Sequence, residues 1–405
     1  MGYKFFAEAR RLWDEARHKK SHITTVQAGF VINILYSMDS MDKLGMTYAV
    51  QALAIAHDLD IFGYPRQTWS RRKKHAYGFT AWCLYSYLSI LCFHLMIPSP
   101  IKEIPKSAVP EIDENPEWYG EFYLQYPLTQ ALSRMDYGRS LKVRTEMSII
   151  VNDLGHYLFD NANGAKRSFK TLVTFARKLL AWYSELPIEL APKYIVFPAQ
   201  LKVHQLYHDT LINVCEGILS SQGQSEYTPP LHNIPKIIES SKVSLETVLR
   251  LYYSRHGFDR SDIHMTHFMH VLATISLRRL QTLRESDSTT SSTELEEVQS
   301  TLVLAAKGLH DQGWNYYLPY IIFHVICDDM GPAESNIMYQ YTDIRKEDLA
   351  TSRLRAKHVQ SQYPIKILNV TEDPEQQRLD DLVSRYANLA LEVSGSDESE
   401  IEDSS

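Results

Sequence analysis

Two groups of histidines have the residue types and spacing that could hold a metal ion. In the first, His204, Gln205 and His208 form an H-Q-x-x-H pattern, which differs at one position from the H-E-x-x-H pattern of zinc proteases. The two histidines share one face of a helix, but glutamine has no titratable carboxylate to activate a metal-bound water. We therefore interpret His204 and His208 as histidines of a core edge or of the surface, and expect no metal there.

The second group is Asp262, His264, His267 and His270, within the segment DIHMTHFMH. Side chains three positions apart on a helix diverge by roughly 60° per step, so His264 and His270 do not converge on one ion. The apolar residues of the segment fit a helix that faces a core: Met265, Phe268, Met269 and Leu272. We expect no metal site here either. A metal-dependent enzyme built on these histidine-rich helices is the third hypothesis for this chain.

No other segment carries a catalytic signature. The sequence contains no G-x-G-x-x-G after a strand, no P-loop, no G-x-S-x-G elbow and no zinc-finger spacing. Its cysteines lie far apart and include no C-x-x-C pair: Cys83, Cys92, Cys215 and Cys327. They are expected to be buried thiols of a reducing compartment. We predict a chain with no catalytic residue, no metal ligand and no cofactor of its own.

Charged segments allow two interpretations each. Arg71, Arg72, Lys73 and Lys74 form the strongest basic run, which fits nuclear import or contact with a DNA backbone. A solvated first turn before an apolar helix is the commoner explanation. The acidic end, 393–405, fits an activation segment or a plain solubilising terminus. Because the net charge is −7, we expect no sequence-specific DNA complex at physiological salt.

The elements that must position these residues are helices. Apolar residues recur every three or four positions and predict an all-α protein of roughly ten helices, with no convincing strand hairpin. Capping boxes at Thr24 with Gln27 and at Thr293 with Glu296 are expected to begin two of them. The longest apolar run, 81–97, is expected to be a core helix rather than a membrane span. The predicted helices cover 5–16, 26–38, 44–59, 74–96, 128–159, 169–186, 201–219, 234–253, 265–280 and 294–309.

Prolines and polar segments divide the chain. Five prolines from Pro98 to Pro116 are expected to hold it extended as it crosses between two groups of helices. The polar segment 285–293 is predicted to be an exposed loop. We predict a helical domain at 1–330, a partly helical extension at 331–392 and an acidic disordered tail at 393–405.

Several motifs occur in one order along residues 1–280. The stretch from Asn115 to Asp153 is the most distinctive, with an aromatic entry punctuated by prolines and then an apolar segment. The other motifs are Thr24 to Gln27; Gly45, Tyr48, Ala52, Ala56, Asp58 and Leu59; Arg71, Arg72, Tyr77, Gly78, Phe79 and Trp82; and Trp182, Leu186, Pro187, Leu190, Pro198, Leu201, His204, Tyr207 and His208. Together they resemble the regulatory middle-homology domain of fungal binuclear zinc-cluster transcription factors, especially those similar to nitrate-assimilation regulators.

The resemblance implies a nuclear, non-catalytic regulator of RNA polymerase II genes. It implies action through effectors, coregulators or a homodimer, with no membrane. Members of that family read DNA through an N-terminal six-cysteine cluster that holds two zinc ions, and this chain contains no such cluster. Zinc and DNA contact are expected only through that missing cluster. Two explanations stay open: a truncated product, or a regulator that lost its DNA reader. The alternative function is a stand-alone helical protein that titrates a related regulator or a coregulator.

Overall fold

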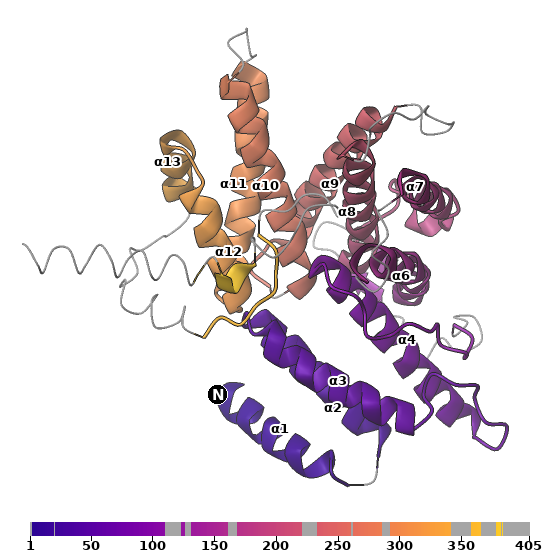
Figure 1. Ribbon diagram of the computed structural model, residues 1–405. Coiled ribbons are helices and arrows are strands. Elements are labelled where there is room, and N and C mark those ends of the chain that lie inside the picture. Colours follow the sequence, from indigo (N-terminus) through magenta and orange to yellow (C-terminus); the bar gives the residue numbers. More distant parts are fainter. Residues whose placement is uncertain are drawn as a thin grey trace, which may run out of the picture.

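The computed structural model is all-α apart from one small hairpin among its described residues, as the sequence predicted (Figure 1). The structure describes residues 2–19, 21–109, 123–125, 131–160, 168–220, 233–260, 262–285, 292–341, 358–365, 378–381 and 383. Its helices are α1 (Gly2–Ala16), α2 (Ile23–Met38), α3 (Asp42–Asp58), α4 (Arg71–His94), α6 (Tyr137–Phe159), α7 (Phe169–Ser184), η2 (Ile188–Leu190), α8 (Pro198–Ser220), α9 (Ile234–His256), α10 (Ile263–Glu285), α11 (Ser292–Gly313), α12 (Tyr317–Asp328) and α13 (Pro332–Tyr341).

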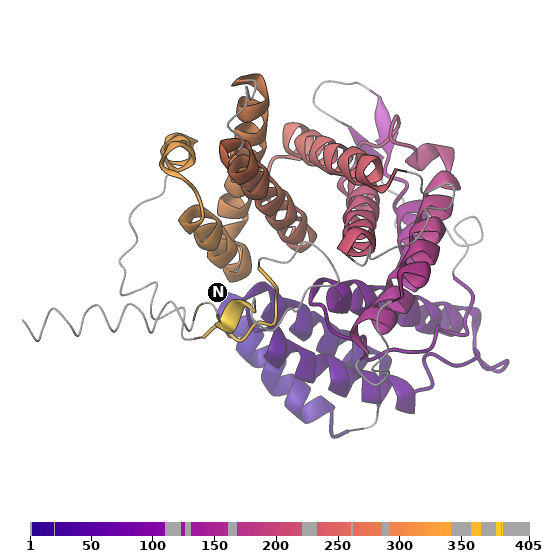
Figure 2. The same ribbon diagram turned by 45° about the horizontal axis from the view of Figure 1, so that its top comes forward.

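Helices α1 to α4 form an N-terminal group with its own core. Each contributes a large buried side chain to one hydrophobic cluster, for example Trp13, Phe30, Leu53 and Trp82. Figure 2 shows these helices as a layer along one side of the molecule, with the later helices standing on it. The three- and four-residue apolar spacing of the sequence therefore marks faces that meet each other.

Helix α4 passes from this core into a second, larger one. Its middle residues, such as Leu88, belong to the first cluster, whereas Ile90 and Phe93 belong to the second. Among the described residues, α4 is the one helix long and apolar enough to cross a membrane, and 67% of its most apolar window is buried inside the protein. This burial fits the predicted core helix. His94, the last residue of α4, has ring contacts with Phe93 and Phe268 of the second core.

The proline-rich connector after α4 is an ordered crossing, as predicted, over the part that the structure describes, which ends at residue 109. Trp82 Nε1 donates a hydrogen bond to the Ser107 carbonyl oxygen at 3.0 Å. Asn152 Nδ2 of α6 donates to the Ile101 carbonyl oxygen at 3.1 Å. The connector therefore lies against both α4 and α6.

The later helices pair as two helical hairpins, α8 with α9 and α10 with α11, followed by α12 and α13 (Figure 1). Residues 358–365, which we call the C-terminal strap, then return to the N-terminal group. Gln362 N donates to Asp42 Oδ1 at 3.0 Å, and Gln360 N donates to the Ser40 carbonyl oxygen at 2.8 Å. Tyr363 of the strap is buried. The strap thus contacts the first turn of α3 while it packs in the second core.

The predicted capping box of Thr24 and Gln27 is wrong. Helix α2 begins before Thr24, and His22 caps it: His22 Nδ1 accepts a hydrogen bond from Thr24 N at 3.3 Å. Gln27 instead donates to Thr80 Oγ1 of α4 at 2.9 Å. The imidazole acceptor two residues earlier satisfies the amide that the box would have satisfied.

Three further expectations fail, one about a hairpin and two about where helices begin. Strands β1 (Tyr123–Gln125) and β2 (Leu132–Arg134) pair antiparallel, where the sequence predicted no hairpin and a helix from residue 128. Helix α6 begins only at Tyr137 because Asp136 has a left-handed φ of 46°, which interrupts a right-handed helix. Helix α11 begins at Ser292, so Thr293 lies inside it and is not its cap.

Several predictions concern residues outside the described ones. These are most of the loop at 285–293, most of the extension at 331–392 beyond α13, and the tail at 393–405. The domain boundaries therefore stay predictions.

Candidate functional site

The H-Q-x-x-H histidines lie in the buried face of α8. His204 Nε2 donates to the Leu190 carbonyl oxygen at 2.8 Å, and its Nδ1 lies 2.8 Å from the Tyr183 hydroxyl. Both ring nitrogens are therefore occupied by protein partners. Burial lowers the pKa of His204, and burial beside His204 lowers the pKa of His208 to about 3. Both rings are neutral structural groups, which fits the interpretation from the sequence.

Asp262 begins helix α10 and is held by three groups. Its Oδ1 accepts from His264 N at 3.2 Å, and Oδ2 accepts from Lys202 Nζ and from the Tyr252 hydroxyl, both at 2.9 Å. This carboxylate is a helix cap and an ion-pair partner. Its side-chain partners are Lys202 and Tyr252.

His264 and His270 line different cavities, as the helical spacing predicted for these two residues. His264 lines a cavity of about 130 Å³ together with Asp42 and Arg144, and His94 and His267 line the same cavity. Burial lowers the pKa of His264 to about 3. His267 and His270 face the strap, where Nδ1 of each lies near the Tyr363 hydroxyl, at 2.9 and 3.0 Å.

His267 also meets two residues that sequence analysis did not connect with it. Its Nε2 lies 3.1 Å from Asp209 Oδ2 of α8, and His94 Nε2 of α4 lies 3.7 Å from the same oxygen. The rings of His94 and His267 are stacked, with centroids 3.7 Å apart and an interplanar angle of 11°. We call His94, Asp209 and His267 the histidine–aspartate cluster.

The histidine–aspartate cluster is mostly buried. The Asp209 side chain is fully buried, and those of His94 and His267 are 13% and 16% exposed. Burial, followed by the neighbouring His267 and His264, holds the pKa of His94 well below its usual value. A cavity of about 30 Å³ borders all three residues. The arrangement offers two imidazole nitrogens and one carboxylate oxygen to a single point between three helices.

The sequence predicted buried thiols, and the four cysteines are buried or partly buried. Cys92 and Cys215 are buried, and Cys83 and Cys327 are partly buried. Burial raises the pKa of Cys83 to about 11 and that of each of the other three to about 12. Such thiols are poor nucleophiles at neutral pH.

The basic run from Arg71 to Lys74 forms the first turn of α4, as expected for a solvated helix start. Ser70 caps this turn by accepting a hydrogen bond from Lys73 N at 3.3 Å. Lys73 Nζ lies 4.6 Å from the centroid of the Trp69 ring. A role of this basic run in nuclear import or in contact with DNA stays a prediction.

A second candidate site is an open groove of about 860 Å³ between the two helical hairpins, which we call the hairpin groove. Glu246 and Arg250 of α9 face Thr301 of α11 across it: Thr301 Oγ1 donates to Glu246 Oε1 at 2.6 Å and accepts from Arg250 at 2.9 Å. Val243 of α9 lines the same groove and is 55% exposed. The groove thus combines paired charges with exposed apolar surface.

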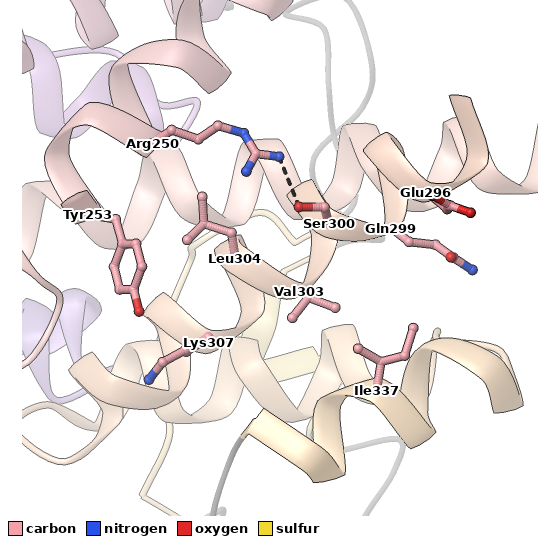
Figure 3. A pocket seen from close by; sticks show the side chains of 9 residues that line it. All are labelled: Arg250, Tyr253, Glu296, Gln299, Ser300, Val303, Leu304, Lys307 and Ile337. Carbon is pink, nitrogen blue, oxygen red and sulfur yellow. Dashed lines mark hydrogen bonds between the residues drawn. The ribbon is translucent and has the colours of Figure 1, made fainter. Parts of the chain in front are cut away.

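A pocket of about 550 Å³ continues the hairpin groove towards α13 (Figure 3). Arg250 lines both and points to Ser300, whose hydroxyl lies 3.3 Å away. Val303, Leu304 and Ile337 supply its apolar wall. This surface is wide and open, in contrast to the histidine–aspartate cluster.

Comparison with known proteins identifies the chain's relatives. It is 23% identical over 344 residues to nitrogen assimilation transcription factor nit-4 of Neurospora crassa, which covers 78% of this chain and 30% of that protein. It is 24% identical over 293 residues to nitrogen assimilation transcription factor nirA of Emericella nidulans, which covers 69% of this chain and 32% of that protein. The chain is homologous to fungal nitrogen assimilation transcription factors.

This similarity confirms the resemblance to fungal nitrogen assimilation regulators that the sequence motifs indicated. The chain spans about a third of the length of these two relatives. No protein-family profile matches it, and no solved structure matches it.

Proposed function

We propose that this chain is a regulatory segment of a fungal transcription factor, which acts on RNA polymerase II transcription in the nucleus. The observation that carries this proposal is its similarity to two nitrogen assimilation transcription factors over 78% and 69% of its length. The segment regulates transcription, and a separate DNA-binding element recognises the target genes. The chain itself has a net charge of −7, which repels a phosphate backbone.

The segment is non-catalytic in this proposal. The H-Q-x-x-H motif supports this, because both ring nitrogens of His204 make hydrogen bonds within the fold. Asp262 is likewise committed to Lys202, Tyr252 and the start of α10. Neither group is free to act on a substrate.

The hairpin groove receives the partner, a helix of a coregulator protein. The groove is bounded on both long sides by helices, and exposed Val243 provides an apolar contact beside paired charges such as Glu216 with Lys242. An amphipathic helix satisfies such a surface by placing apolar residues in the groove and charged residues at its rim. The size and openness of the groove fit a peptide segment better than an enclosed metabolite.

A reporter assay tests the proposed function. The full chain is fused to an unrelated DNA-binding domain, and expression from its cognate promoter is compared with that of the DNA-binding domain alone. We expect the tethered chain to change reporter expression about tenfold, in a way that depends on the nitrogen source. If the untethered chain instead lowers the output of a full-length relative, and tethering has no effect, the stand-alone titrating protein replaces this proposal.

A further inference from the structure

The hydrogen bonds around His267 assign a proton to one side of its ring. His270 Nε2 lies 2.6 Å from the Ile365 carbonyl oxygen, which can only accept, so Nε2 carries the hydrogen. His270 is 3% exposed, and burial favours its neutral form, so its Nδ1 is a lone pair. The Tyr363 hydroxyl, 3.0 Å away, must donate its single hydrogen to that Nδ1.

The same hydroxyl therefore accepts from its other neighbour. His267 Nδ1 lies 2.9 Å from the Tyr363 oxygen and is the donor in that contact. A neutral His267 ring then carries a lone pair on Nε2, and that atom lies 3.1 Å from Asp209 Oδ2. Two acceptors face each other at hydrogen-bond distance, an arrangement that repels unless a positive species lies between them.

The remaining contacts of Asp209 leave its charge uncompensated. Asn213 Nδ2 donates to its Oδ1 at 3.2 Å, and within the described residues its ion-pair contacts come from His94 and His267 alone. His94 Nε2, 3.7 Å from Oδ2, has no hydrogen-bond partner in the described part of the chain. A buried carboxylate without a counter-charge is costly. Three electron-pair donors thus converge on one point in the interior.

We propose that His94 Nε2, His267 Nε2 and Asp209 Oδ2 bind one divalent transition-metal ion of the zinc class. Two imidazoles with one carboxylate suit zinc and its neighbours, whereas calcium and magnesium require oxygen ligands. The three ligand atoms all lie within 4.8 Å of one another. Ligands at about 2.1 Å from a tetrahedral ion are about 3.4 Å apart, close to the two distances to Asp209.

The surroundings supply the other parts of such a site. Tyr363 accepts the Nδ1 hydrogen of His267, which is the outer-shell contact that orients a ligating histidine. The cavity of about 30 Å³ beside the cluster has room for a water as fourth ligand. The ion must lie near the plane of each ring, so the stacked His94 and His267 rings turn apart when it binds. The bound ion joins α4, α8 and α10 at the second core.

The test uses the full chain, stripped of metal with a chelator and titrated with Zn²⁺ alone. We expect one tightly bound ion per chain and a higher melting temperature. His267→Gln and His94→Gln each lower the affinity about 100-fold or more, and Tyr363→Phe lowers it about tenfold while the ligands remain. His204→Gln is the matched control: it alters a buried, hydrogen-bonded histidine elsewhere on α8 and keeps the bound ion.

Cobalt substitution of the wild-type chain gives a second measurement that does not depend on how the variants fold. We expect the visible bands of a nitrogen- and oxygen-bound Co²⁺, without thiolate charge transfer. A chain that binds no stoichiometric Zn²⁺ or Co²⁺, which would mean that a proton alone fills the position, overturns the proposal. So does an ion retained by both His267→Gln and His94→Gln, or a thiolate band that assigns the ion to cysteine.

Discussion

At the residue scale, the buried histidines couple folding to pH. Burial lowers the pKa of His204 below its ordinary value of 6.5, so the folded ring stays neutral where the unfolded ring takes up a proton. The unfolded state therefore gains protons as the pH falls through 6.5, and the free energy of unfolding falls with it. The groups that face this ring are the Tyr183 hydroxyl, the Leu190 carbonyl and His208.

His204→Gln tests this coupling, because the amide can reproduce both hydrogen bonds but does not titrate. We expect the variant to lose about 1 kcal/mol at pH 7, and to lose less additional stability than the wild type between pH 7 and pH 5. One proton accounts for up to about 1.4 kcal/mol per pH unit. Urea unfolding at the two pH values, in the presence of a chelator, measures the difference. Equal losses in both proteins would contradict a neutral His204.

The sequence alone was enough to judge metal binding by one histidine group but not by the other. His204 and His208 lie four positions apart, and the missing carboxylate in their motif already argued against zinc. His267 could be judged only against its helical neighbours, because His94 and Asp209 come from other helices. The polar character of His94 in an apolar run was the available local signal, and it did not identify a partner. Convergence of distant residues depends on tertiary packing, which local spacing does not contain.

At the element scale, helices α10 and α11 pack closely enough to require a glycine. A Cβ atom at Gly308 of α11 would overlap Met269 Sδ of α10 and lie 3.0 Å from two ring carbons of Phe258. Met269 and Phe258 are both buried and have little room to move. Helices α10 and α11 therefore pack closely at Gly308, and a larger residue there would push them apart.

Gly308→Ala should destabilise the protein by about 1–3 kcal/mol through overpacking. Gly155→Ala is the matched control, because it also adds a methyl group within a helix and its nearest neighbour would lie at 3.9 Å. The control should gain about 0.5–1 kcal/mol from helix propensity. Chemical denaturation measures both. A neutral or stabilising effect of Gly308→Ala would show that the helices do not approach as described.

Helices were predictable from apolar periodicity, whereas the starting residues of α2, α6 and α11 were not. The sequence located α7 and α9 within a few residues, because their apolar spacing is regular. The capping box at Thr24 failed because His22 offered a competing acceptor. The helix expected from residue 128 starts late, because Asp136 adopts a left-handed conformation that its sequence context did not reveal.

At the scale of the whole molecule, the C-terminal strap connects the two cores. Asp42 is 3% exposed and accepts from Gln362 N, and burial raises its pKa. Tyr363 of the same strap contacts His267 and His270 in the second core. Removal of the Asp42 carboxylate should therefore weaken the attachment of the whole strap.

Asp42→Ala leaves the Gln362 amide without an acceptor and should cost about 1–3 kcal/mol. Asp42→Asn keeps an amide oxygen in the same place, so it should retain most of the stability. Hydrogen exchange at residues 358–365 should accelerate in the alanine variant and stay close to wild type in the asparagine variant. Unchanged protection in both would mean that the strap is held without Asp42.

We propose that this chain regulates transcription through a partner that binds in the hairpin groove. Two exposed valines test it most directly: Val243 lines the groove and is 55% exposed, while Val50 of α3 lies outside it and is 53% exposed. Each is changed to Asp in the chain tethered to an unrelated DNA-binding domain, and reporter expression is measured at equal protein level. We predict that Val243→Asp reduces the regulatory effect about tenfold and that Val50→Asp leaves it unchanged. Equal output from the two variants, or no effect of the tethered wild-type chain, would contradict the claim.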